Sequence, residues 1–153
     1  MSSAFATVKK AFFDTKAVMS AVDKATLKVL SKFGAFVRTR AKSSIRSRKG
    51  ASSPGTPPHS HSGLLKRGIL FSYDRDRRTV VIGPELLRKA GLGTAPNALE
   101  YGGHATRKKW RTQGGRRSLV PKQVGIAARP YMHPAFEKEK LGLLKIWANS
   151  VKP

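Results

Sequence analysis

The chain has 153 residues, enough for one domain, and 39% of them are hydrophobic, which suffices for one core and argues against general disorder. Its 31 Lys and Arg residues against 8 Asp and Glu give a formal net charge of +23, so we expect a polyanion nearby in the working state. Without cysteine the chain forms no disulfide and no thiolate metal site, and no segment approaches the ~20 apolar residues of a membrane span. Lysines interrupt the apolar residues at the N-terminus, which predicts no signal peptide and assembly in the cytoplasm.

The first periodic segment, residues 18–48, predicts a long amphipathic helix. Apolar residues recur along it at three- and four-residue steps, from Val22 through Phe33 to Ala41. Gly34 costs about 1 kcal/mol relative to alanine inside a helix, so we expect it to permit a close contact or a bend. The opposite face is cationic and has no Glu four residues away to pair with it, which indicates a functional electropositive surface. This face consists of Lys24, Lys28, Lys32, Arg38, Lys42, Arg46 and Lys49.

The middle of the chain predicts a loop, a hairpin and short connecting elements. Residues 51–62 are rich in Ser, Pro and Gly and predict an irregular, flexible and exposed loop. Two β-rich runs, 68–73 and 79–83, are separated by a charged turn and predict a β-hairpin. Residues 85–93 predict a short helical turn or a loop, and residues 98–101 a short helix or strand.

The last third of the chain predicts a basic arm followed by a helix. Residues 104–125 contain glycine and many cations and predict an arm or long hairpin, with a further strand at 126–131. Pro134 suits the first turn of a second helix. The order of elements predicts a single α+β domain over residues 1–153, with a long N-terminal amphipathic helix, a small antiparallel β-sheet with a hairpin, and a C-terminal helix.

Catalytic and metal sites have little support in this sequence. His59 and His61 lie in a Ser- and Pro-rich loop with no carboxylate close by, which is typical of exposed histidines rather than metal ligands. The Gly-x-Ser-x-Gly motif of hydrolases is absent, and carboxylates are too scarce for the metal site of a nuclease. We therefore expect no enzyme, no metal and no cofactor.

The basic segments point to phosphate contacts without base recognition. No helix-turn-helix, zinc-finger or basic-zipper pattern is present. Aromatic residues are not interleaved with the cations as a single-strand stacking platform requires, Trp110 excepted. Trp110 equally suits an interface anchor, since tryptophan is favoured in such positions.

Three short segments, in order, carry a family resemblance. They are TPP at 56–58 followed by SGLLKRGI at 62–69, then ALEYGG at 98–103, and finally ARPYMHPAFE at 128–137. Together they resemble the tail-completion (head–tail joining, or neck) proteins of long-tailed bacteriophages, which are similar to tail terminators. More loosely, the chain resembles the virion-morphogenesis proteins of contractile-tailed phages.

This resemblance implies a structural protein of the virion neck. Such a protein forms a ring, expected to be a hexamer, that joins the DNA-filled head to the tail tube and lets the genome pass. The implied partners are other copies of the chain, the adaptor or stopper proteins on the portal side, the tail tube protein and genomic DNA bound non-specifically, with no membrane. A small basic architectural nucleic-acid-binding protein remains the alternative, and a nuclease a third and weaker one.

Two sets of candidate site residues follow. The first set comprises basic residues expected to face DNA in the lumen or acidic partners: Arg38, Lys42, Arg46 and Lys49 on the helix, and Arg107, Lys108, Lys109 and Arg111 on the arm. The second set comprises candidate contacts between subunits or between rings: Pro57, Pro58, Glu100, Tyr101, Trp110, Arg129 and Tyr131. For Glu100 we expect an arginine partner, and for Tyr131 plain core packing is the preferred interpretation.

Overall fold

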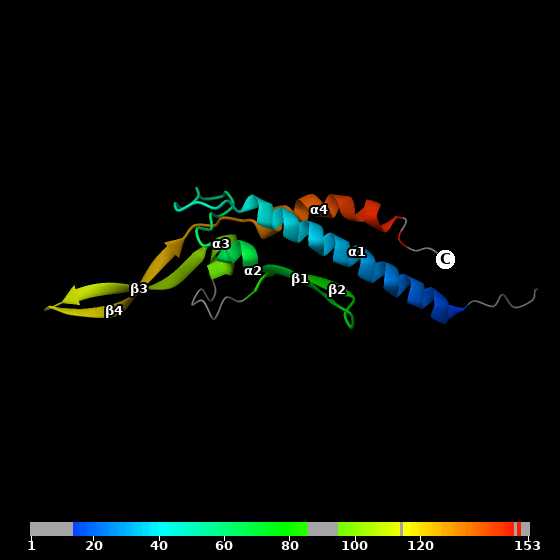
Figure 1. Ribbon diagram of the computed structural model, residues 1–153, viewed down its shortest axis with the longest axis horizontal. Helices are drawn as coiled ribbons and strands as arrows, with labels where there is room; N and C mark the ends of the chain where they lie inside the picture. Colours follow the sequence, from blue (N-terminus) through cyan, green and yellow to red (C-terminus); the bar gives the residue numbers. More distant parts are fainter. Residues whose placement is uncertain (1–13, 86–94, 114, 149, 151–153) are drawn as a thin grey trace, which may run out of the picture.

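The computed structural model describes residues 14–85, 95–113, 115–148 and 150 (Figure 1). It confirms the predicted α+β class, with a long N-terminal helix, antiparallel hairpins and a C-terminal helix. The strands form two separate two-stranded sheets rather than one small sheet. The elements in chain order are α1 (Thr15–Ser44), α2 (Leu64–Gly68), β1 (Ile69–Asp74), β2 (Thr79–Pro84), α3 (Ala95–Tyr101), β3 (Gly103–Gln113), β4 (Arg116–Ile126) and α4 (Met132–Trp147).

A hydrogen bond between a side chain and the backbone lies at each end of helix α1. The Asp14 carboxylate accepts the N–H of Ala17 at 3.0 Å, which caps the first turn. At the other end, the Ser44 hydroxyl donates to the carbonyl of Ala41, and Ile45 turns into an extended conformation with its side chain in the core. The helix therefore stops at Ser44, four residues before its predicted end.

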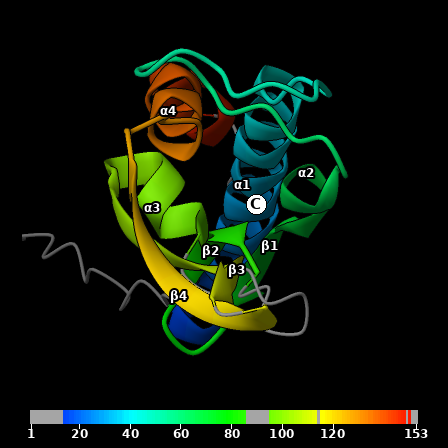
Figure 2. The same cartoon turned by 90° about the vertical axis from the view of Figure 1, so that its left-hand side faces the viewer.

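The body of the molecule is built around α1. Helix α4 and the β1–β2 sheet pack against different sides of α1, as Figure 2 shows. The core lies where these elements meet and consists of Phe33, Val37, Ala41, Ile45, Leu65, Ile69, Tyr131 and Ala135. The rings of Phe33 and Phe136 meet edge to face at 5.6 Å between centroids, which joins α1 to α4.

Gly34 lets α1 approach the sheet closely. A Cβ atom added at this position would lie 2.8 Å from Cγ2 of Val80 and 2.9 Å from Cδ2 of Phe71. The close-contact role predicted for this glycine is thus confirmed.

The segment before β1 differs from the prediction in two ways. Residues 51–62 have no regular element, as expected, but they are tied to the body and not wholly exposed. The N–H of Gly55 donates to the carbonyl of Ala128 at 2.8 Å, and Ser52, Pro58 and Ser60 are buried. A short helix that the sequence did not predict, α2, then precedes β1, entered through a left-handed glycine, Gly63, at φ 71°.

The predicted arm is confirmed as the β3–β4 hairpin. Its two strands of 11 residues each pair in an antiparallel register from Gly103↔Ile126 to Gln113↔Arg116. The hairpin extends away from the body on the side opposite to the N-terminal end of α1 (Figure 1).

The structure agrees only in part with the predictions for the segments that flank the arm. Residues 98–101 are helical, as part of α3. The strand predicted at 126–131 is wrong, because β4 ends at Ile126 and the N–H of Arg129 bonds instead to the carbonyl of Leu99. The element predicted at 85–93 lies, beyond Glu85, outside the described residues.

Candidate functional site

The acidic residues are largely used by the fold itself. All eight belong to the described residues, and three of them form ion pairs there: Glu139 with Arg40, Asp23 with Arg78 at 3.0 Å, and Glu137 with Lys140 at 3.6 Å. Three others, Asp14, Asp74 and Glu100, accept backbone N–H groups. The positive charge is therefore poorly compensated within the described part of the chain, which leaves a surface suited to anions.

The four helix candidates of the sequence analysis fall into different environments. Arg38 is partly committed to the fold, since its Nε donates to the carbonyl of Ile69 at 3.1 Å. Burial, together with the charges of Arg38 and Lys66, lowers the pKa of Lys42 below its usual value. Arg46 and Lys49 are exposed but lie beyond the end of α1. The prediction that they belong to the cationic face of this helix is therefore wrong.

Lys66 is a further cation close to Lys42 that the sequence analysis did not single out. It sits on α2, a five-residue helix too short to show a hydrophobic period, and lies 24 positions after Lys42 in the chain. Only the folded structure brings Lys66 near Lys42.

The arm candidates are separated by the strand register. Lys108, Lys109 and Arg111 are all exposed. Successive residues of a strand point to opposite faces, so Lys109 and Arg111 share one face and Lys108 shares the other with Trp110. The backbone of Arg107 lies opposite that of Lys122, a further exposed cation that the sequence analysis did not single out.

The candidate contact residues divide into surface and core. Tyr101, at 79% exposure, and Trp110, at 56%, lie on the surface. Pro58, Glu100 and Tyr131 are buried within the chain, which corrects their assignment as contacts between subunits. Tyr131 is 1% exposed, so its preferred interpretation as a core residue is confirmed.

The remaining two contact candidates are half-buried. Pro57 adjoins the buried Pro58 in the loop. Arg129 holds that loop to the body, since its Nε donates to the carbonyl of Ser52 at 2.8 Å and its Nη1 to that of Ala127 at 3.0 Å. Its guanidinium therefore acts within the fold.

Glu100 binds the start of α4 and not an arginine. One carboxylate oxygen accepts the N–H groups of Tyr131 and Met132, both at 3.0 Å, and the other accepts that of His133 at 2.8 Å. These donors are the otherwise unpaired N–H groups of a helix N-terminus, where negative charge is stabilising. Burial, and then the charge of Glu100, raises the pKa of the Tyr131 phenol.

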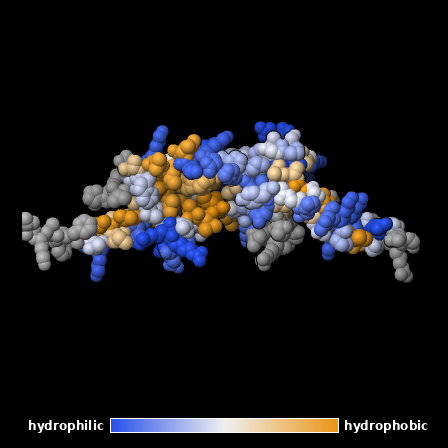
Figure 3. Space-filling view, turned by 180° about the vertical axis from the view of Figure 1, so that it is seen from behind, coloured by the Kyte–Doolittle hydropathy of each residue, from blue (hydrophilic) through white to orange (hydrophobic). Residues whose placement is uncertain are grey.

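Large apolar side chains remain exposed on the body. On α4, Leu141 is 81% and Leu144 79% exposed, one helical turn apart. Leu70 and Val81 are exposed on the face of the β1–β2 sheet opposite to α1. Figure 3 shows hydrophobic surface gathered over the middle of the molecule, on the side turned away in Figure 1. Such surface is typical of proteins that associate with other chains.

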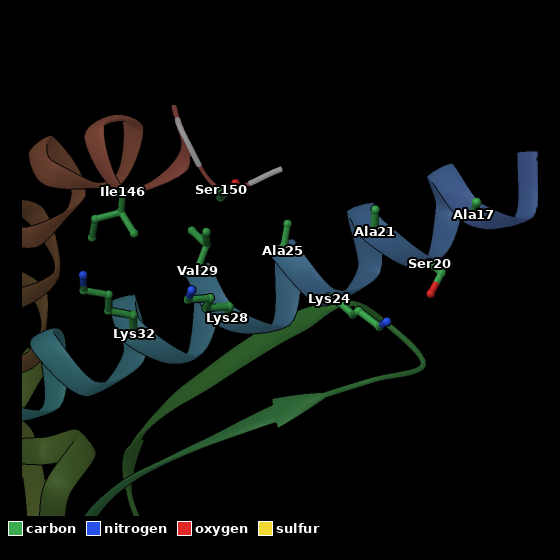
Figure 4. Close-up of a pocket in the computed structure, with 10 residues that line it drawn as sticks. All are labelled: Ala17, Ser20, Ala21, Lys24, Ala25, Lys28, Val29, Lys32, Ile146 and Ser150. Carbon is green, nitrogen blue, oxygen red and sulfur yellow. The ribbon is translucent and has the colours of Figure 1, made fainter. Parts of the chain in front are cut away.

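A groove of about 720 Å³ runs along α1 beside the end of α4 (Figure 4). Small side chains and lysines line it, together with one isoleucine and one valine: Ala17, Ser20, Ala21, Lys24, Ala25, Lys28, Val29, Lys32, Ile146 and Ser150. The described residues that line the groove include no His, Asp or Glu.

The described residues provide no assembled metal site. Nδ1 of His59 donates to the carbonyl of Gly50 at 2.9 Å, and no three His, Asp or Glu residues of the described part lie together as metal ligands would. No helix among those residues is long and apolar enough to span a membrane. Comparisons of the chain with models of known protein families, with curated proteins and with solved structures found no match.

Proposed function

We propose that the chain is a neck, or tail-completion, protein of a long-tailed bacteriophage. Copies of it form a ring, of six in the expected arrangement, between the portal-side proteins of the head and the tail tube. Genomic DNA passes through this ring, and the finished protein resides in the virion. The family resemblance of the three sequence segments named above suggests the role, and the form of the β3–β4 arm is the observation that carries it.

The arm is an element that needs a partner. A two-stranded hairpin by itself is marginally stable in water, and this one extends from the body with Trp110 and Leu119 exposed on one face. Packing against a neighbouring ring protein covers this exposed face. The exposed Leu141 and Leu144 of α4 offer a second apolar contact surface.

The uncompensated positive charge fits a ring around DNA. A closed ring of such chains concentrates like charge, which is unfavourable unless a polyanion or acidic partners stand close by. Phosphate contacts made by Lys and Arg hold DNA without reading its sequence, as passage of a whole genome requires.

Loss of the protein from infected cells tests the proposal. We expect full heads and complete tails that remain separate, and we expect purified protein to join them when added. A variant lacking residues 104–125 tests the arm, because it retains α1, α4 and the β1–β2 sheet. We expect that this variant does not restore joining. Normal joined particles in the absence of the protein would overturn the proposal.

A basic architectural nucleic-acid-binding protein is the second candidate. The small number of ion pairs favours it, since three pairs leave most described cations open to phosphates. This candidate requires tight DNA binding at physiological salt and a phenotype without a particle defect, whereas the neck protein requires weak, salt-sensitive binding.

A further inference from the structure

The two faces of the β3–β4 arm differ in charge. Lys109 and Arg111 on β3 and Lys122 on β4 project on one side, here called the cationic face. Trp110 and Leu119 stand opposite each other in the register and project on the other side, here called the apolar face, which carries Lys108 as its one exposed described cation.

No acidic residue dilutes the charge of this region. The chain contains none between Glu100 and Glu137, and the carboxylate of Glu100 is buried against the start of α4. An anion that approaches the arm therefore meets cations on an element that stands clear of the body, and among the described residues Lys109, Arg111 and Lys122 form no ion pair (Figure 1). The electrostatic attraction is local to the arm and not only a consequence of the net charge.

The shape of the arm matches a groove of duplex DNA. The major groove, about 12 Å wide, admits a two-stranded β-ribbon. Strands of 11 residues span about 36 Å, close to the ~34 Å of one helical turn of DNA. A ribbon of this length reaches phosphates along a full turn.

We propose that the arm binds double-stranded DNA through the cationic face, with Lys109, Arg111 and Lys122 on phosphates, and turns the apolar face toward protein. Lys and Arg contacts of this kind position a ribbon on DNA and carry no sequence preference. Trp110 and Leu119 serve as a protein contact, because exposed tryptophan in a cationic setting is typical of an interface anchor. The inference rests on the proposed function, since passage of the genome through the ring brings DNA within reach of the arm.

The salt dependence of DNA affinity tests this assignment on the purified full-length chain. Each lost phosphate contact makes the negative slope of log K against log salt shallower by about 0.9, so K109Q/R111Q/K122Q should make it shallower by about 2.7 for duplex DNA of unrelated sequences. The matched control is K108Q, adjacent to Lys109 in the chain but on the apolar face, which should leave the slope unchanged. Circular dichroism checks that each variant keeps its fold.

Each outcome bears on one proposal only. If K108Q alone made the slope shallower by about 0.9, a third of the change expected for the triple variant, the assignment of faces would be overturned, because the attraction would then be spread over the whole arm. An unchanged slope in the triple variant would overturn DNA binding by the arm and favour an acidic protein as its partner. Head–tail joining is measured separately. If joining proceeds without the protein while the triple variant loses slope, the neck role fails and the DNA-binding arm stands.

Discussion

The carboxylate of Glu100 accepts the backbone N–H of Tyr131 at 3.0 Å and, with its other oxygen, the N–H of His133 in the first turn of α4 at 2.8 Å. Glu100 lies in the last turn of α3, shortly before the arm begins at Gly103, and Tyr131 immediately precedes the helix that follows the arm. This single carboxylate therefore ties together the two points at which the arm joins the body. The contact explains how a protruding hairpin can have a fixed base.

Replacement of Glu100 should weaken the whole fold. Glu100→Ala leaves three N–H groups at the start of α4 without their acceptor, one of them buried, and should cost about 3 kcal/mol of unfolding free energy. Glu100→Gln retains one acceptor oxygen and should cost about half as much. Urea denaturation measures both values.

The control for Glu100 is Glu137→Gln. Glu137 is an exposed carboxylate on α4 whose ion pair with Lys140 should contribute less than about 0.5 kcal/mol. If Glu100→Ala were as stable as Glu137→Gln, the proposed role of Glu100 at the helix N-terminus would be wrong.

Tyr131 should make the protein less stable at high pH. Burial, and then the Glu100 charge, raises the pKa of its phenol above the usual value of about 10. Above pH ~10 the unfolded chain therefore releases this proton while the folded chain keeps it, so stability falls by up to about 1.4 kcal/mol per pH unit.

Tyr131→Phe removes this titration and serves as the reference. From pH 10 upward, we expect the unfolding free energy of the natural chain to fall relative to that of the variant. Lys42, whose pKa is lowered, acts in the opposite direction but is present in both proteins and cancels. A difference that stays constant from pH 8 to 11 would contradict the prediction.

Sequence patterns anticipated the parts of the fold that depend on local order. The three- and four-residue spacing predicted α1, the β-rich runs predicted β1 and β2, and the glycine-containing basic stretch predicted the arm. The role of Glu100 was not predictable, since its backbone partners lie 31 to 33 positions away and leave no local signal. Burial of Pro58 was not predictable for the same reason, because hydrogen bonds to distant residues hold its loop in place.

Gly34→Ala and Gly142→Ala should change stability in opposite directions. Both glycines lie within helices, where alanine is better by about 1 kcal/mol when space allows. At Gly142 a Cβ meets nothing within 4 Å, so the substitution should stabilise by about that amount. At Gly34 the Cβ overlaps Val80 and Phe71, and overpacking of about 1–3 kcal/mol should exceed the gain. Thermal unfolding measures both, and equal stabilisation by the two would refute the close approach of α1 to the sheet.

Arg129→Ala should loosen the loop without affecting the arm. The guanidinium holds the carbonyl of Ser52, close to the hydrogen bond from Gly55 to Ala128. Hydrogen exchange at the Gly55 amide should accelerate about tenfold, while exchange in the ladder between β3 and β4 should not change. Arg75→Ala, at an exposed position in the turn between β1 and β2, is the control and should leave both rates unchanged. Equal acceleration throughout would mean that Arg129 acts on global stability and not on the loop.

Leu119→Ala should weaken head–tail joining more than Val124→Ala does. Both residues are exposed apolar side chains of β4, but Leu119 lies on the apolar face beside Trp110 and Val124 lies on the cationic face. If the apolar face packs against protein, truncation of Leu119 removes buried contact area and should raise the concentration needed for half-maximal joining about tenfold. Val124→Ala removes a similar side chain from the face assigned to DNA and should leave that concentration within about twofold, because phosphate contacts there come from cations. Equal effects of the two variants would show that the faces of the arm are not divided between protein and DNA.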